Sequence, residues 1–256
     1  MSWELKRKII YAVAVVIGVL AISIFLLRET LFPTPTCFDK KQNGFESGID
    51  CGGGCLLRCE QEISPLTVLW VKAVHGGKDM YDLVAMVNNN NIENASLETG
   101  YTFSLYDEQG NISGFLSGST TAPLGGKFPI IIQNITLKKA PTSVTLTLSD
   151  SPHYSVKESP SSPTIKIVDR RYEAGQIPRV YATIVNTKRA EINNLPVRVL
   201  LFDEKDNVYA VGQTVIPFLG KEEIKEIIIT WNGPLLTSPT RIGIYPIFNP
   251  FDAIGY

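Results

Sequence analysis

Histidine and cysteine are scarce in this sequence, and their scarcity excludes several classes of catalytic and metal site. Of 256 residues, two are histidines (His75 and His153) and four are cysteines, all within residues 37–59. Both histidines stand among turn-forming residues, so we expect them in exposed turns. The sequence contains no HExxH, Gly-x-Ser-x-Gly, phosphate-binding or dinucleotide-binding motif. We therefore expect a protein that is not an enzyme.

Excess charge and amphipathic helices are also missing. The chain has 24 basic and 25 acidic residues, a formal charge of −1, so it lacks the basic footprint of nucleic-acid-binding proteins. After the first 28 residues no stretch of a dozen residues has the apolar periodicity of a helix, whereas short Val-, Ile- and Thr-rich runs alternate with turn signals. This pattern predicts a mostly β protein that does not bind nucleic acid.

One long hydrophobic run is present, at residues 9–27, and it contains no charge. A helix of this length spans about 29 Å, close to the hydrocarbon thickness of a bilayer. Three basic residues precede the run: Lys6, Arg7 and Lys8. Only Arg28, offset by Glu29, follows, so the positive-inside rule places the N-terminus in the cytoplasm and the bulk of the chain outside the membrane. The alternative is a cleaved signal peptide, but its apolar region is usually shorter, about 7–15 residues.

The four cysteines have the spacing C-x13-C-x3-C-x3-C, which matches neither the close pairs of a zinc site nor a C-x-x-C redox motif. Outside the membrane, thiols tend to pair. We therefore expect two disulfides, with three connectivities open, among Cys37, Cys51, Cys55 and Cys59. The segment has too few apolar residues to bury a core, so disulfides would have to hold it together.

Polar residues recur between these cysteines at intervals of four, three and four: Asp39, Asn43, Glu46 and Asp50. Two interpretations stay open. Hard oxygen ligands on a glycine-relaxed loop suit Ca²⁺, whereas the same groups also cap turns by accepting backbone N–H groups. The segment resembles the short repeat C-x-D-G-x-x-N-x-x-E-x-G-x-D-C-G-G-x-C of secreted and surface-anchored proteins, although Lys40 stands where that repeat has glycine. The resemblance implies a small cysteine-rich surface module.

The remainder of the chain reads as two copies of one β domain. A stretch beginning near Val87-Asn88 aligns with a stretch beginning near Val185-Asn186, and a Ser/Pro-rich segment separates the two. We expect a cytoplasmic tail (residues 1–8), a transmembrane signal anchor (9–28), a Pro-rich spacer (29–36), a cysteine-rich module (37–62), a first β-sandwich (64–150), a Ser/Pro linker (151–162), a second β-sandwich (163–250) and a C-terminal tail (251–256).

A short motif recurs at the same place in both copies. The first copy carries Phe103, Leu105, Tyr106 and Asp107. The second carries Leu201, Phe202 and Asp203, with valine at the first aromatic position. The motif resembles that of the FxLYD-type domains, small extracytoplasmic immunoglobulin-like modules, which implies a binding or spacer module without catalytic residues. Independently, strand alternation predicts Phe103 and Leu105 on one face, with the acidic residue opening a turn.

Together these patterns predict a single-pass cell-membrane protein of mostly β fold, with an N-terminal transmembrane helix, a small disulfide-rich segment and two tandem immunoglobulin-like β-sandwiches. The expected function is interaction with a protein or envelope partner, in adhesion or envelope assembly. The first alternative is an accessory subunit of a secretion, pilus or transport complex, and the second is an envelope glycan hydrolase. Asn111 and the asparagine run at residues 88–91 are expected at loop tips that could contact a partner.

Overall fold

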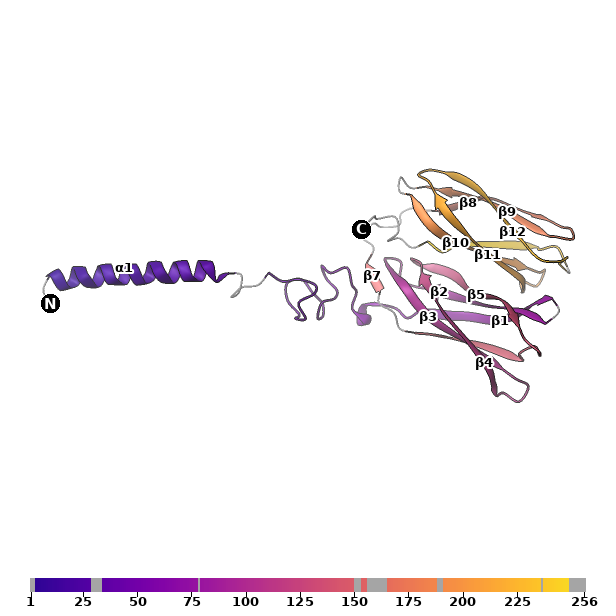
Figure 1. Cartoon of the computed structure of the whole chain (residues 1–256), viewed down its shortest axis with the longest axis horizontal. Coiled ribbons are helices and arrows are strands. Elements are labelled where there is room, and N and C mark those ends of the chain that lie inside the picture. Colours follow the sequence, from indigo (N-terminus) through magenta and orange to yellow (C-terminus); the bar gives the residue numbers. More distant parts are fainter. Residues whose placement is uncertain are drawn as a thin grey trace. The chain divides into compact units, whose positions relative to one another are not determined.

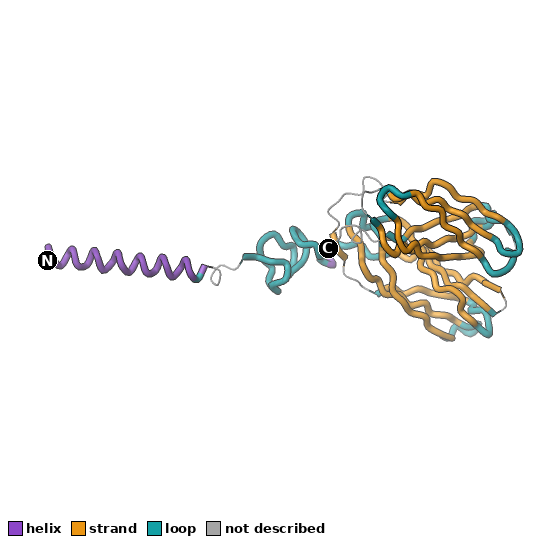
Figure 2. Tube along the Cα trace, turned by 45° about the horizontal axis from the view of Figure 1, so that its top comes forward, coloured by secondary structure: helices purple, strands orange, loops and turns teal. Residues whose placement is uncertain are grey.

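The computed structural model is mostly β and contains one N-terminal helix (Figures 1 and 2). It describes residues 3–28, 34–77, 79–149, 153–155, 165–187, 191–235 and 237–248. The chain divides into two compact units, Met1–Gly54 and Cys55–Tyr256. The division falls inside the segment that the sequence groups as one cysteine-rich module, residues 37–62.

The helix α1 spans Trp3–Leu26. Its segment Lys6–Leu26 is long and apolar enough to cross a membrane, and none of it is buried within the molecule. At its N-terminal end the guanidinium of Arg7 lies 3.6 Å from the centroid of the Trp3 ring. The helix therefore presents an apolar surface that nothing in the described protein covers.

The first β-sandwich is built from two antiparallel sheets. Its strands are β1 (Thr67–Gly77), β2 (Met80–Asn89), β3 (Asn94–Tyr106), β4 (Ile112–Ala122), β5 (Gly126–Thr136), β6 (Ser143–Leu148) and β7 (His153–Ser155). One sheet has the order β1-β2-β5 and the other β4-β3-β6, with β7 also paired to β3. A short 3-10 turn, Glu60–Glu62, precedes β1.

The second β-sandwich has the same strand order. Its strands are β8 (Ile165–Glu173), β9 (Arg179–Asn186), β10 (Ile192–Phe202), β11 (Val208–Leu219), β12 (Ile224–Thr230) and β13 (Arg241–Pro246). The sheet β8-β9-β12 corresponds to β1-β2-β5, and β11-β10-β13 corresponds to β4-β3-β6. In β9 every second residue is buried, as the period of two predicts for a strand with one face in a core.

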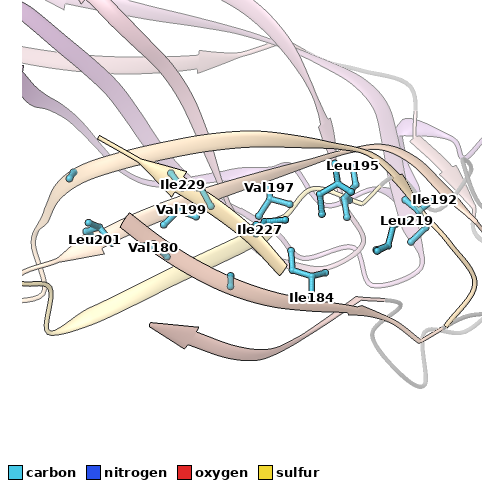
Figure 3. Close-up of a cluster of buried hydrophobic side chains, with 13 residues drawn as sticks. Val180, Ile184, Ile192, Leu195, Val197, Val199, Leu201, Leu219, Ile227 and Ile229 are labelled. Carbon is cyan, nitrogen blue, oxygen red and sulfur yellow. The ribbon is translucent and has the colours of Figure 1, made fainter. Parts of the chain in front are cut away.

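Each sandwich encloses its own hydrophobic core between its two sheets. The first core contains Leu83, Ala85, Val87, Phe103, Leu105, Ala122, Phe128 and Ile130. In the second, shown in Figure 3, side chains from both sheets meet: Val180, Ile184, Ile192, Leu195, Val197, Val199, Leu201, Leu219, Ile227 and Ile229. These cores, the helix and the disulfide-bonded cysteines confirm the fold class expected from the sequence.

A third buried cluster joins the two sandwiches. One half comes from the sheet β1-β2-β5: Val74, Val84, Met86 and Ile131. The other half comes from β10 and β11: Leu200, Phe202, Val208 and Val211. Strands β2 and β10 alternate between a sandwich core and this cluster, so both of their faces are buried. The unit Cys55–Tyr256 therefore has hydrophobic packing across the boundary between its sandwiches.

The structure corrects two details of the sequence interpretation. The segment expected as a Ser/Pro linker contains a strand, β7, which pairs with β3; residues 151, 152 and 156–162 of it lie outside the described residues. Both histidines lie in strands rather than turns. His75 is exposed in β1, with its ring 5.2 Å from that of Tyr81, and His153 is half-buried in β7.

Candidate functional site

The cysteine-rich segment contains no metal-binding thiol, because all four cysteines are disulfide-bonded and none is free. Cys55 and Cys59 are buried, and Cys37 and Cys51 are half-buried. A disulfide-bonded cysteine cannot supply the thiolate that a zinc or redox site requires. What the segment offers chemically is therefore its exposed side chains and the oxygen atoms of its polar residues.

In the unit Met1–Gly54 the predicted ligand residues form hydrogen bonds that hold its loop: Asn43 is bonded to Asp39 and Glu46, whereas Asp50 is bonded to the backbone of Lys40. Both carboxylate oxygens of Asp50 accept the Lys40 amide N–H at 3.0 Å, and Glu46 Oε2 accepts that of Asn43 at 3.1 Å. Asp39 accepts the Lys41 N–H at 2.9 Å and the Asn43 side-chain amide at 2.8 Å. The Asn43 bond holds the pKa of the Asp39 carboxyl below its ordinary value.

These oxygens nevertheless keep some capacity for a hard cation. A carboxylate oxygen has more than one acceptor position, and Asn43 Oδ1 is buried without a hydrogen-bond partner among the described residues. The donor set of carboxylates and an amide oxygen is the kind that Ca²⁺ takes. The turn-capping role is visible in the bonds themselves, and calcium binding stays a prediction.

Backbone geometry at Lys40 shows what a lysine costs at this position. Lys40 has a φ of 60°, in the left-handed region where glycine is unstrained and a lysine costs about 1 kcal/mol. The bond from its N–H to Asp50 holds it there. Gly53, in contrast, cannot be replaced by a residue with a side chain, because a Cβ at that position would lie 1.6 Å from the carbonyl oxygen of Phe45.

The next residues, which begin the unit Cys55–Tyr256, are attached to the first sandwich. Leu57 forms an isolated bridge with Tyr154 of β7, and the Arg58 N–H donates to the carbonyl of His153 at 2.9 Å. The Arg58 side chain donates to Asn94 Oδ1 at 3.3 Å and pairs with Glu62 at 3.6 Å. Strand β7 thus lies between β3 and the segment that carries the last two cysteines, a role that nothing in its sequence indicated.

The repeated motif occupies equivalent places in the two sandwiches. Phe103 and Leu105 are buried in the first core, and Leu201 in the second. Tyr106 is half-buried, whereas Phe202 points to the cluster between the sandwiches and carries the Arg241 guanidinium 3.4 Å from its ring centroid. The motif is therefore structural at its apolar positions.

The acidic residue of each motif organises a turn in the same way. Asp107 Oδ1 accepts the N–H groups of Gln109 and Asn111 at 3.0 and 2.8 Å. Asp203 Oδ1 accepts those of Lys205 and Asn207 at 2.9 and 2.8 Å. The bond from the Asn207 backbone, above all, holds the pKa of Asp203 below its ordinary value. These two aspartates are turn caps, in agreement with their position before a hairpin.

Two of the asparagines expected at a loop tip are buried instead. Asn89 donates to the carbonyl of Pro123 at 2.7 Å, and Asn91 exchanges two hydrogen bonds with the backbone of Ser64, at 2.8 and 2.9 Å. In the second sandwich Asn186 donates to the carbonyl of Gly220 at 2.8 Å. By burial, the residue of the first sandwich that is equivalent to Asn186 is Asn89. The sequence alignment matches Asn186 with Asn88, one residue earlier. A one-residue shift in a strand exchanges its faces, so this difference decides which side chains are buried.

Arg198 is the buried charge at the boundary between the sandwiches. It stands on β10, only 8% exposed, and its guanidinium donates to Thr120 Oγ1 at 2.9 Å and to the carbonyl of Pro129. Its Nε has no hydrogen-bond partner among the described residues. Burial lowers the pKa of Arg198 to about 10, so it stays charged at neutral pH. Sequence reasoning missed it, although an arginine in an otherwise apolar strand was a visible signal.

The first sandwich also contains a buried carboxylate, Asp82, whose role is structural. Its Oδ1 accepts the N–H of Asn134 at 2.8 Å, where β5 bulges against β2 and Asn134 has a φ of 60°. Burial raises the pKa of this carboxyl. The partners of Asp82 are neutral groups, the Asn134 backbone and the Gln133 side-chain amide. The geometry of Asp82 is that of a strand-bulge cap.

Comparison with known proteins adds little to this description. No protein-family model matches the sequence, and no curated protein matches it. Among solved structures, that of red sea bream transglutaminase aligns with a TM-score of 0.22 and 12% identity. The alignment covers 70% of this chain and 29% of that one, so this chain spans under a third of the other protein's length.

Proposed function

We propose that this protein is a membrane-anchored interaction module that presents two tandem immunoglobulin-like β-sandwiches of the FxLYD type on the extracytoplasmic side. The observation that carries the proposal is the succession of α1 and the disulfide-bonded cysteines. An apolar helix that the protein leaves uncovered is followed, within about a dozen residues, by the first of four oxidised cysteines. Disulfides form in oxidising compartments, which supports an outward-facing chain.

The β-sandwiches support an interaction role rather than catalysis. Three of their buried polar residues, Asn89, Asn186 and Asp82, are engaged with backbone groups and hold strand ends together. The matching strand order supports two copies of one module. Under this proposal the disulfide-bonded segment is a short collar beside the membrane and the sandwiches are the surface that meets a partner.

Membrane topology is the direct test. We expect an impermeant protease added to intact cells to digest the region after residue 34 and leave a small membrane-embedded fragment containing α1. Cell-lysed material provides the control for protease access. Retention of the full mass after treatment of intact cells, together with digestion after lysis, would overturn the outward orientation. Release of the chain without α1 into the medium would instead identify a cleaved signal peptide.

The collar's polar residues have a separate test. If they only cap turns, native mass spectrometry of the purified protein shows the same mass with added Ca²⁺ and after EDTA, and Asp50→Ala lowers the thermal midpoint equally in both. If they also hold calcium, the mass increases by one ion and EDTA lowers the midpoint of the wild type but not of Asp50→Ala.

A further inference from the structure

Strand β4 is an edge strand that lacks the usual protection against pairing. Among the strands that the structure describes, only β3 pairs with it. The edge strands β1, β5, β8, β11, β12 and β13 each contain a charged residue or a proline. Strand β4 contains neither over 11 residues. The other edge strands without them, β6 and β7, are six and three residues long. Natural sheets place charges, prolines or very short strands at their edges because an open edge recruits another strand.

The exposed part of β4 is residues 112–119. At its C-terminal end this part is followed by Thr120, which is buried and accepts a hydrogen bond from Arg198. Before that point two large apolar side chains face solvent: Ile112 is 50% exposed and Phe115 is 63% exposed. Leu116 packs against the first core from the opposite face. The open edge thus combines unpaired backbone groups with an exposed aromatic ring.

The sequence of this edge is self-complementary. In an antiparallel pairing of two identical strands centred on Leu116, Ser113 lies opposite Ser119 and Gly114 opposite Gly118. Phe115 then lies opposite Ser117, so the exposed aromatic side chain meets a small one, and Leu116 lies opposite its own copy on the axis. Gly118 also has an internal reason to be glycine, since a Cβ there would lie 2.5 Å from the Tyr101 hydroxyl. Packing within one chain does not account in this way for the residue types of the other pairs, Ser113 with Ser119 and Phe115 with Ser117.

We infer that β4 is an isologous dimer contact, in which two copies of this chain pair antiparallel through residues 113–119 with Leu116 on the two-fold axis. The pairing would join two sheets, each made of β4, β3, β6 and β7, into one continuous sheet of eight strands and satisfy the open backbone groups of both copies. A neutral edge suits a second copy because identical strands that carried charge would repel each other across the axis. This contact goes beyond the proposed interaction role, and it does not depend on the orientation of the membrane helix.

Two single variants test the register as well as the contact. In a homodimer, Phe115→Lys places two lysines near the axis, one from each copy, and Ser117→Glu places two glutamates there. Because like charges repel, we expect each variant to weaken dimerisation roughly tenfold. Mixed together, one chain's new lysine lies opposite the other's new glutamate, while the second pair keeps its native Phe115 and Ser117. Native mass spectrometry of the full chain in detergent should then show more heterodimer than either homodimer.

The matched control is Thr147→Lys, which adds the same charge to an exposed position of β6 in the same sheet and should leave the dimer unchanged. Thermal unfolding of each variant confirms that it is folded. A wild type that stays monomeric at its highest soluble concentration would overturn the inference. A dimer unaffected by both single variants, or a mixture without heterodimer preference, would overturn it equally.

Discussion

The two sandwiches share a strand order but differ in the sheet that each leaves exposed. In the second, the outer face of β8-β9-β12 is charged: Arg171 pairs with Glu226 at 3.3 Å and lies over the Tyr181 ring at 3.8 Å, and Arg179 pairs with Glu173 at 3.6 Å. In the first, the outer face of β4-β3-β6 carries hydroxyls, where Thr102 and Ser117 share a hydrogen bond of 2.9 Å. One fold thus presents a charged surface and a neutral one.

The inner sheets differ from both, because each is buried on two faces. Sheet β1-β2-β5 packs one face on the first core and the other on the cluster it shares with β10 and β11. The boundary between the sandwiches therefore buries one sheet from each and leaves the other sheet of each exposed on its outer face. We therefore expect the two sandwiches to unfold in one transition, although their exposed sheets differ in charge.

The largest test of this sharing is a matched pair of core truncations. Leu105→Ala and Leu201→Ala remove equivalent buried side chains, and each should lower the free energy of unfolding by about 2–5 kcal/mol. Because the shared cluster couples the sandwiches, we expect both variants to shift one common transition. Trp231 packs against the second core and Trp70 against the shared cluster, so single-tryptophan versions can follow the second sandwich and the boundary separately by fluorescence. Two separated midpoints, each moved by only one variant, would show independent sandwiches.

The next effect concerns the buried cation at the shared boundary. Arg198→Ala leaves the acceptors at Thr120 and Pro129 unpaired and opens a gap, so it should cost about 1–3 kcal/mol of unfolding free energy. Arg198→Met fills most of the volume and removes an uncompensated charge, so it should recover most of that loss. Equilibrium urea unfolding of both variants measures the difference. Equal losses would mean that the guanidinium hydrogen bonds, rather than the volume that the side chain fills, stabilise the boundary.

The same residue gives a pH signature. Its folded-state pKa of about 10 lies below its ordinary value, so the unfolded chain binds a proton that the folded chain releases above pH 10. The contribution of Arg198 to stability therefore rises with pH above about 10 and is constant at neutral pH. When unfolding is followed across that range, the slope of unfolding free energy against pH should be more positive in the wild type than in Arg198→Met, because tyrosines and lysines titrate in both proteins.

A smaller effect is expected at the two turn-capping aspartates. The pKa of Asp203 lies below its ordinary value, so its contribution to stability is present above that ordinary value and is lost as pH falls through the lowered one. Asp203→Ala should lower the thermal midpoint at neutral pH and match the wild type at acid pH. Asp107→Ala removes the equivalent bonds in the first sandwich and is the paired variant. A deficit for Asp203→Ala that persists unchanged into acid would contradict a carboxylate cap.

Local patterns were enough to predict the elements, whereas the contacts between them were not predictable. Alternation identifies strands such as β9, and the turn after Asp107 follows from its residue types. The sequence did contain one signal of the shared boundary: β10 ends in a nearly continuous apolar run from Val197 to Phe202, which is typical of a strand buried on both faces. Its partner sheet could not be identified, because periodicity describes a strand's faces but not what covers them.

The buried asparagines also show that contacts between distant parts of the chain could not be predicted from local sequence. Composition places Asn89 and Asn91 in exposed loops, since asparagine is disfavoured in strands. Their burial depends on carbonyl groups of Pro123 and Ser64, which are distant along the chain and adjacent only in the fold. Hydrogen bonds from a side chain to backbone groups far away in the sequence leave no local sequence pattern. They account for the one-residue difference between the sequence alignment and the strand faces that the structure buries.

The smallest effect expected is on the charged face of the second sandwich. Arg171→Ala removes the pair with Glu226 and the contact with the Tyr181 ring, both at exposed side chains, so it should cost about 0–1 kcal/mol of unfolding free energy. Salt screens exposed ion pairs, so the part due to Glu226 should shrink in high salt while the ring contact persists in part. Urea unfolding at low and high ionic strength separates the two. A loss as large as that of Arg198→Ala would mean that the charged face stabilises the sandwich as well as shielding its edges.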